Sequence, residues 1–346
     1  MPQSIMSRVF FCRRCLNQAA RLGGGKPRFF TTSVTHKRAW IPTFQPTSSQ
    51  NLDELLSLFR DRVFIPAFLN AAQRRLIYKE DAATTLNQNP ITITLQGATE
   101  ESYKLRPLKF SETPSNNAVR DAIGLMKEPQ DWHTLVPLLR GLHSSKRTPN
   151  FLLWEFIVRK AGEAGMNSVI IDCAVQSHRT GFSLGDYVLA ELLFSNLHTK
   201  AELAGYKGAE VETALRQAKR VAVLMNSEDH APVDKMKPDP RRHPNIISVL
   251  LELSAAHALD AFRGKDTLGD VRSYAEKLLG TWVLRGKFDP IKYPKKNIRK
   301  VTDLPSVRKG IEMALQVEEI KKDGKLSQAL GERLRELETP ADGARA

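Results

Sequence analysis

The sequence predicts an all-α protein in which antiparallel helix pairs stack into a short α-solenoid, with one small β-hairpin near the amino end. Three observations support this fold class. Apolar residues recur every three or four positions through most of residues 118–284, the period of a helix with one buried face. The only convincing strand pattern, a strict alternation of apolar and polar residues, occurs near residues 91–106. A segment within residues 131–158 resembles the chain 36 positions further on, which indicates an internal repeat.

Length and composition are those of a globular protein. The chain has 346 residues, 41% hydrophobic and 26% charged, which suffices for two domains or one elongated array. No run of 18 uncharged apolar residues occurs, so the sequence predicts no membrane span. Three cysteines, two of them within the first fifteen residues, are too few for a disulfide scaffold.

Residues 1–38 predict a mitochondrial transit peptide. The segment holds eight Lys or Arg and no Asp or Glu, with apolar residues spaced through it. Two adjacent arginines interrupt the apolar core that a secretory signal needs. Arg28–Ser33 resembles the two-step processing signal of matrix proteins, which implies a mature chain that begins near Phe30 or Arg38. The alternative is a disordered basic tail.

The leader accounts for most of the net charge. The formal charge of +14 falls to +6 without it, so the high isoelectric point is no argument for nucleic-acid binding. Residues 285–300 hold seven basic residues against Asp289 alone, an excess of +6, and the rest of the mature chain is close to neutral.

Residues 285–300 are the predicted RNA-binding segment. Prolines keep the backbone extended, and aromatic residues lie between the charges, so the segment can follow phosphates and stack a base. The alternative is a solvated basic connector. The residues expected to contact RNA are Arg285, Lys287, Lys292, Tyr293, Lys295, Lys296, Arg299 and Lys300.

The expected organisation has five parts. They are a transit peptide at 1–38, helices with a hairpin and linker at 39–117, a helical-repeat domain at 118–284, a basic Pro/aromatic extension at 285–304, and C-terminal helices and tail at 305–346. The first part of the mature chain should hold one helix from Asn51 and another over about Pro66–Glu80. The repeat domain should hold helices at 118–127, 131–144, 150–163, 167–180, 187–204, 208–225, 244–262 and 268–284.

The repeat carries a family resemblance. Asn150 and Phe151 match Asp186 and Tyr187 at a spacing of 36, as a cap followed by an aromatic. The stretch Thr148–Ile157, which continues to a Glu-Ala-Gly ending, resembles the first helix of a pentatricopeptide repeat, and later pairs are equally similar to tetratricopeptide units. The family implies a solenoid whose concave face binds RNA; its base-reading positions are not transferred to so degenerate a set. The alternative is an irregular all-α domain.

A search for catalytic or metal sites is mostly negative. The sequence has no phosphate-binding loop after a strand, no nucleophile elbow and no Cys/His ligand group, because Cys12 and Cys15 lack partners at matching spacing. Asp172 and Asp260, on apolar helices, are the suggestive buried carboxylates. Cys173 should be a buried, inert thiol. We therefore expect no catalytic residue, no cofactor and no metal.

Other charged segments are less specific. The pairs Arg74-Arg75 and Lys146-Arg147 can touch phosphate, but most such pairs face water. The insertion at 226–243 balances its charges and should be a flexible loop. Residues 305–338 form an amphipathic helix pair that should pack on the end of the solenoid or on a partner rather than on a membrane.

These observations predict a noncatalytic, RNA-associated scaffold of mitochondrial gene expression, in the setting of the mitochondrial ribosome. Its expected location is the matrix, and its expected partners are mitochondrial rRNA or mRNA and neighbouring mitoribosomal proteins, with no small-molecule substrate. The alternative is a protein–protein adaptor, such as an assembly factor for an inner-membrane respiratory complex. A small-molecule enzyme ranks third.

Overall fold

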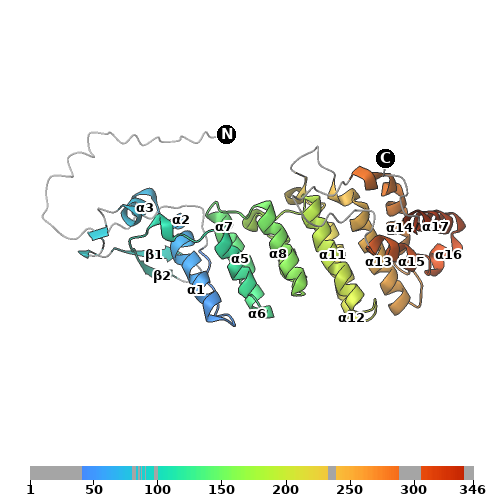
Figure 1. Ribbon diagram of the computed structural model, residues 1–346, viewed down its shortest axis with the longest axis horizontal. Helices are drawn as coiled ribbons and strands as arrows, with labels where there is room; N and C mark the ends of the chain where they lie inside the picture. The colour runs from blue at the N-terminus through green and yellow to red at the C-terminus, as the bar shows by residue number, and fades with distance from the viewer. Residues whose placement is uncertain are drawn as a thin grey trace, which may run out of the picture. The chain divides into compact units, whose positions relative to one another are not determined.

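The structure, a computed structural model, describes residues 41–79, 83, 84, 86, 88, 89, 91–96, 100–232, 239–287 and 305–338. Helices dominate this part of the chain, and a single two-stranded sheet accompanies them there (Figure 1). The predicted all-α class with one small hairpin is therefore confirmed.

The first half of the described chain contains α1 Gln50–Phe59, the π-helical η1 Arg60–Phe64, α2 Ile65–Phe68, α3 Ala71–Tyr78, β1 Thr92–Gln96, β2 Glu100–Lys104, the 3-10 turn η2 Phe110–Glu112, α5 Asn116–Leu125, α6 Pro129–Trp132, α7 Leu135–Ser144, α8 Phe151–Glu163, α9 Asn167–Val175 and α10 Ser177–Thr180. The second half contains α11 Tyr187–Leu203, α12 Ala209–Leu224, the 3-10 turns η3 Glu228–His230 and η4 Pro240–Arg242, α13 Pro244–Ala261, α14 Asp270–Thr281, the 3-10 segment η5 Trp282–Lys287, α15 Pro305–Ala314, α16 Glu318–Lys322 and α17 Gly324–Glu338.

The helix predicted over about Pro66–Glu80 is divided into two. Leu69 has extended backbone angles that end α2. Asn70 then starts α3 through a capping box: its side chain accepts from the Gln73 N–H at 2.9 Å, and the Gln73 side chain accepts from the Asn70 N–H at 3.1 Å. Ile77 is the buried residue of α3.

The predicted hairpin is present, with its strands slightly displaced. β1 and β2 pair antiparallel, and Ile93 lies opposite Tyr103. Leu105, just after β2, joins Leu69 and Ile77 in a small apolar cluster beside the main core. This packing supports a two-stranded sheet that would be marginally stable alone.

Helices pack in two rows within the described part of the compact unit that spans residues 39–346. In the first row, α1, α5, α8, α11, α13 and α15 each contact the next helix, and Figure 1 shows α1, α5, α8 and α11 side by side in that order. In the second row, α7 contacts α9 and α9 contacts α12. Consecutive helices also pair across the rows, as α8 does with α9, α11 with α12 and α13 with α14.

Three helices of the first row begin at a regular sequence spacing. Ser115, Asn150 and Asp186 precede α5, α8 and α11, and each side chain accepts a hydrogen bond from a backbone N–H of the first turn. These caps are 35 and 36 residues apart. The sequence similarity at 36 positions therefore coincides with the distance between equivalent helix starts.

The insertion at 226–243 is more ordered at its ends than predicted. His230 and His243 are buried. The Leu184 N–H donates to His230 Nδ1 at 3.3 Å, and the His243 side chain caps α13 by accepting from the Asn245 N–H. A flexible loop is thus the wrong description of these two flanks, because both are packed on helix ends; residues 233–238 lie outside the described part.

The segment 305–338, predicted as a helix pair, forms the three helices α15, α16 and α17, and these pack on the end of the helix rows, as predicted. α15 lies against α13, and α17 contacts both α14 and α15. Gly310 lets α15 approach closely, since a Cβ atom there would lie 2.9 Å from the Ser248 carbonyl oxygen on α13. Ile311 on α15 and Leu330 on α17 are fully buried.

Candidate nucleic-acid interface

The structure describes only the beginning of the predicted RNA-binding segment. Arg285 and Lys287 lie within the 3-10 segment η5. The remaining predicted residues lie outside the described chain: Lys292, Tyr293, Lys295, Lys296, Arg299 and Lys300.

Both flanks of this segment are attached to the core. On the amino side, Trp282 is 7% exposed, and its Nε1 donates to a Glu336 carboxylate oxygen on α17 at 2.9 Å. The Arg333 guanidinium lies 5.7 Å from the same indole ring, a cation–π distance. On the carboxyl side, α15 begins at Pro305 and buries Val307. The described residues on both sides of the basic segment are therefore fixed in the C-terminal part of the fold.

A pocket of about 110 Å³ lies beside Pro305. It is smaller than the roughly 300–1,000 Å³ of most small-molecule sites. Its lining is acidic and contains no Lys or Arg: Glu191, Phe194, Ser195, His198, Thr199, Glu202, Asn245, Val249, Pro305 and Ser306.

One of the lining residues, His198, belongs to a buried hydrogen-bonded pair with Glu252. Glu252 on α13 is fully buried, and its carboxylate oxygens lie 2.8 and 3.0 Å from His198 Nδ1 on α11. Burial raises the pKa of Glu252, and the hydrogen bonds from His198 and Tyr206 act against that rise. Burial and the neighbouring Glu252 raise the pKa of the Tyr206 phenol. His198, Tyr206 and Glu252 thus connect α11 to α13, and their polar groups hydrogen-bond to one another rather than point toward a substrate site.

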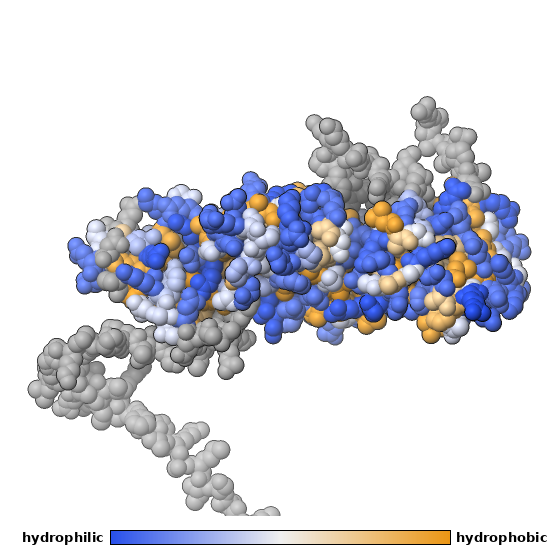
Figure 2. All heavy atoms as spheres, turned by 90° about the horizontal axis from the view of Figure 1, so that it is seen from below, coloured by the Kyte–Doolittle hydropathy of each residue, from blue (hydrophilic) through white to orange (hydrophobic). Residues whose placement is uncertain are grey.

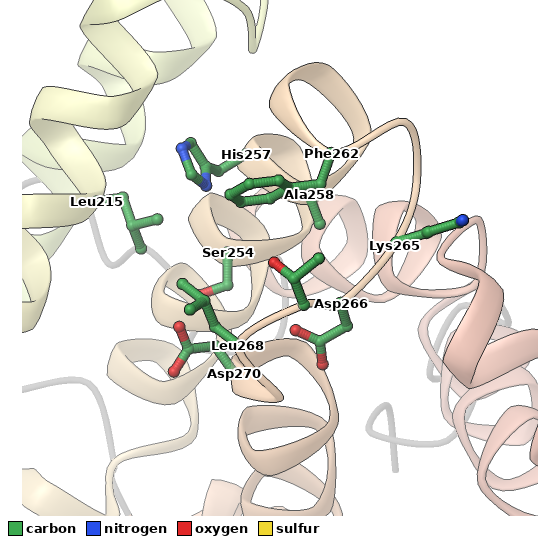
Figure 3. A pocket seen from close by; sticks show the side chains of 10 residues that line it. Leu215, Ser254, His257, Ala258, Phe262, Lys265, Asp266, Leu268 and Asp270 are labelled. Carbon is green, nitrogen blue, oxygen red and sulfur yellow. The ribbon is translucent and has the colours of Figure 1, made fainter.

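A second pocket, between α12, α13 and the loop before α14, holds about 10 Å³, or roughly one water. Figure 3 shows Ser254, His257 and Phe262 around it, while the Lys265 side chain points away. His257 is half-buried and contacts Phe262 edge-on, with ring centroids 5.1 Å apart. The arrangement is one of packing rather than of catalysis.

The two carboxylates singled out from the sequence are not buried. Asp172 is exposed and lies 3.4 Å from Arg220, and Asp260 is exposed and accepts from the Gly208 N–H at 2.8 Å. The fully buried carboxylates among the described residues are instead Asp131 and Glu252. Helical periodicity wrongly placed Asp172 and Asp260 in the core, because α9 and α13 are apolar on more than one side. The signal in the sequence that could have identified Glu252 as buried is that it is a single acid within a long apolar run.

The described residues contain no group of three or more His, Cys, Asp or Glu placed to hold a metal ion. No described helix is both long and apolar enough to cross a membrane. Cys173 is buried as predicted, and burial raises the pKa of its thiol. On the face drawn in Figure 2, apolar residues are interspersed among polar ones.

Comparison with known proteins gives the chain its family. The family described as mitochondrial ribosomal protein mS27 (Mrp13) matches residues 28–346. The small ribosomal subunit protein mS27 of Neurospora crassa is 27% identical over 288 residues, which cover 78% of this chain and 72% of that protein.

By these matches, the chain is a helical protein of the mitochondrial ribosome, as the sequence predicted. The chain belongs to the mitochondrial ribosomal protein mS27 family. It is a structural component of the small subunit, acts in mitochondrial translation, and has mitoribosomal proteins and rRNA as its partners.

Proposed function

We propose that this protein is a noncatalytic scaffold in the mitochondrial matrix, whose helical body packs on neighbouring ribosomal proteins while residues 285–300 contact rRNA. The observation that carries the proposal is the concentration of charge. Seven basic residues lie in a segment whose two flanks are anchored by Trp282 and Val307, and the rest of the mature chain is nearly neutral.

The helical body supports a repeat scaffold of the pentatricopeptide or tetratricopeptide type. Caps at spacings of 35 and 36, and two rows of helices, are the features expected of stacked helix pairs. The proposed organisation keeps the parts 1–38, 39–117, 118–284, 285–304 and 305–346. Few units of this kind offer shape more than sequence readout, which favours rRNA over mRNA as the partner of the basic segment.

Sedimentation of the tagged protein tests this proposal. In gentle mitochondrial lysates the wild-type protein should sediment with the small subunit and redistribute on EDTA or RNase treatment. Alanine at Lys292, Lys295, Lys296, Arg299 and Lys300 should shift it to the top of the gradient at lower salt than the wild type, because phosphate contacts are salt-sensitive.

The matched control replaces Arg241 and Arg242 with alanine. Arg241 already pairs with Asp239 at 2.6 Å, so the loss of this basic pair should leave sedimentation unchanged. A wild-type protein that sediments as a small, RNase-insensitive species would contradict the proposal. Equal salt sensitivity of the five-alanine variant and the wild type would exclude the basic segment as the contact.

A further inference from the structure

Two basic pairs, 72 positions apart in the sequence, each contribute one arginine beside an aromatic stack with an exposed phenylalanine. Arg74 and Arg75 lie on α3, and Lys146 and Arg147 lie in the turn between α7 and α8. Each pair alone is typical of a residue pair facing water. The structure adds the aromatic surface between them.

The stack consists of Tyr78, the last residue of α3, and Phe110, the first of η2. Their ring centroids are 4.2 Å apart and their planes differ by 8°. Phe110 is nevertheless 73% exposed. The Leu108 N–H donates to the Ile77 carbonyl at 2.7 Å, and this bond holds the two ring-bearing segments together. A phenylalanine so exposed, on a fixed backbone, offers a flat apolar surface to solvent.

Arginines flank this surface from two elements. Arg74 precedes Tyr78 by one helical turn and so shares its face of α3. Arg147 Nη1 donates to the Pro114 carbonyl at 2.8 Å, which brings the α7–α8 turn onto the segment that follows Phe110. Burial raises the pKa of Tyr78, and the charges of Arg147 and Arg74 act against that rise, as expected of guanidiniums near the phenol.

The acid closest to Phe110 in the sequence is already paired. Glu112, two residues after Phe110, is engaged by Arg62 from η1. Lys109, adjacent to Phe110, is a further exposed cation. An apolar partner surface placed on the ring would have to desolvate these cations without compensation. A nucleotide offers both a base for the ring and a phosphate for the guanidiniums.

We propose that Arg74, Tyr78, Phe110 and Arg147 form a second RNA-binding surface, on which an unpaired base stacks against Phe110 and the adjoining phosphates lie beside the two arginines. The inference rests on the proposed role of the protein as an RNA-contacting ribosomal component. This surface is separate from residues 285–300, and its RNA binding can be tested independently of theirs.

Fluorescence anisotropy of the full mature chain with a labelled oligo(A) of about 12 nucleotides tests the surface. Phe110→Ala should weaken binding roughly 5- to 150-fold, which corresponds to the loss of one stacked base. Phe110→Trp should retain the affinity, because the indole preserves the stacking face. Leu203→Ala is the control, since Leu203 is 84% exposed at the end of α11, and its removal should change nothing.

The salt dependence tests the arginines. Arg74→Ala should lower the slope of log affinity against log salt by about 0.7, the value for one lost phosphate contact on a single strand. Arg216→Ala, an exposed arginine on α12, should leave the slope unchanged. Unchanged affinity for Phe110→Ala, or a wild-type chain that does not bind the oligonucleotide, would overturn the inference.

Ultraviolet crosslinking of purified mitochondrial small subunits places the test in the assembled particle. We expect a nucleotide adduct on the peptide that carries Phe110 or Tyr78. The Phe110→Ala effect should persist in a chain whose residues 292–300 carry the five alanines, so the two surfaces can fail separately. A Phe110→Ala variant that binds RNA normally but loses a neighbouring ribosomal protein would assign the surface to protein binding and overturn the proposal.

Discussion

Single buried polar residues hold distant parts of this chain together. Asp131, fully buried before α7, accepts hydrogen bonds from the backbone N–H groups of Ser48, Lys127 and Glu128 at 2.9–3.0 Å and from the Ser48 hydroxyl at 2.7 Å. Burial alone would raise the pKa of this carboxyl, but the hydrogen bonds together lower it. The carboxylate therefore fastens the chain entering α1 to a loop 83 residues away.

Asp131→Asn should reduce the free energy of unfolding by about 2 kcal/mol at neutral pH, because the amide cannot accept all four bonds. A carboxyl whose pKa is lower in the folded state stabilises the fold above its unfolded pKa, near 4. The difference between wild type and variant should shrink as the pH falls below about 4. Urea unfolding at several pH values measures it, and a difference that is independent of pH would contradict this account.

The His198–Glu252 pair gives a second prediction at this scale. His198→Ala should cost about 3 kcal/mol, because it leaves Glu252 buried without its closest partner. Replacing both residues with leucine should cost less than the single change, since no buried charge is then left over. Glu202→Gln is the control: this glutamate is 55% exposed and 3.8 Å from the histidine, so urea unfolding should change by less than about 0.5 kcal/mol.

The close contact between α13 and α15 depends on a glycine, Gly310. Gly310→Ala should destabilise the protein by about 1–3 kcal/mol, because the new methyl group meets the Ser248 carbonyl of α13 and forces α15 away. Limited proteolysis should then cut before residue 305 faster than in the wild type.

The same substitution on α17 should have the opposite sign. Gly331 has no neighbour within 4 Å of an added Cβ, so Gly331→Ala should stabilise the helix by up to about 1 kcal/mol. Thermal unfolding of both variants gives the comparison. Equal effects of the two changes would show that helix propensity, not the α13–α15 contact, governs position 310.

Elements with local signals were predictable, and those set by tertiary contacts were not. Asn150 and Asp186 mark helix starts that the structure places at Phe151 and Tyr187, because capping chemistry acts within one turn. The break at Leu69 was missed, because Asn70 competes with helix continuation by capping a new helix. The Tyr78–Phe110 stack joins segments separated by the hairpin, and no local pattern announces it.

Across the whole unit, one apolar core extends from Ile41 to Leu330. We expect a single cooperative unfolding transition, and Cys173 reports on it because the thiol is fully buried and its pKa is raised. In a mature chain lacking Cys12 and Cys15, labelling with a thiol reagent should follow the urea transition seen by circular dichroism. Labelling well below that transition would reveal a separately opening part around α9.

The overall class could be predicted from helical periodicity, and the role in the ribosome from the acid-free leader, the degenerate repeats and the basic segment together. The position of every RNA-contacting residue could not, because charge in a sequence shows where cations are numerous but not which of them meet. Arg74 and Arg147 illustrate this: each belongs to an ordinary surface pair until the fold sets both beside one aromatic ring.

The central position of α13 has a consequence for how the protein is made. Every residue from Pro244 to Ala256 is buried, and the cover comes from α11 and α12 before it and from α14 and α15 after it. Synthesis proceeds from the amino end, so one side of α13 stays uncovered until α14 and α15, which extends to Ala314, have followed it. A nascent or incomplete chain thus exposes a long apolar helix to chaperones and proteases, and only a complete chain can be assembled into a particle with this helix covered.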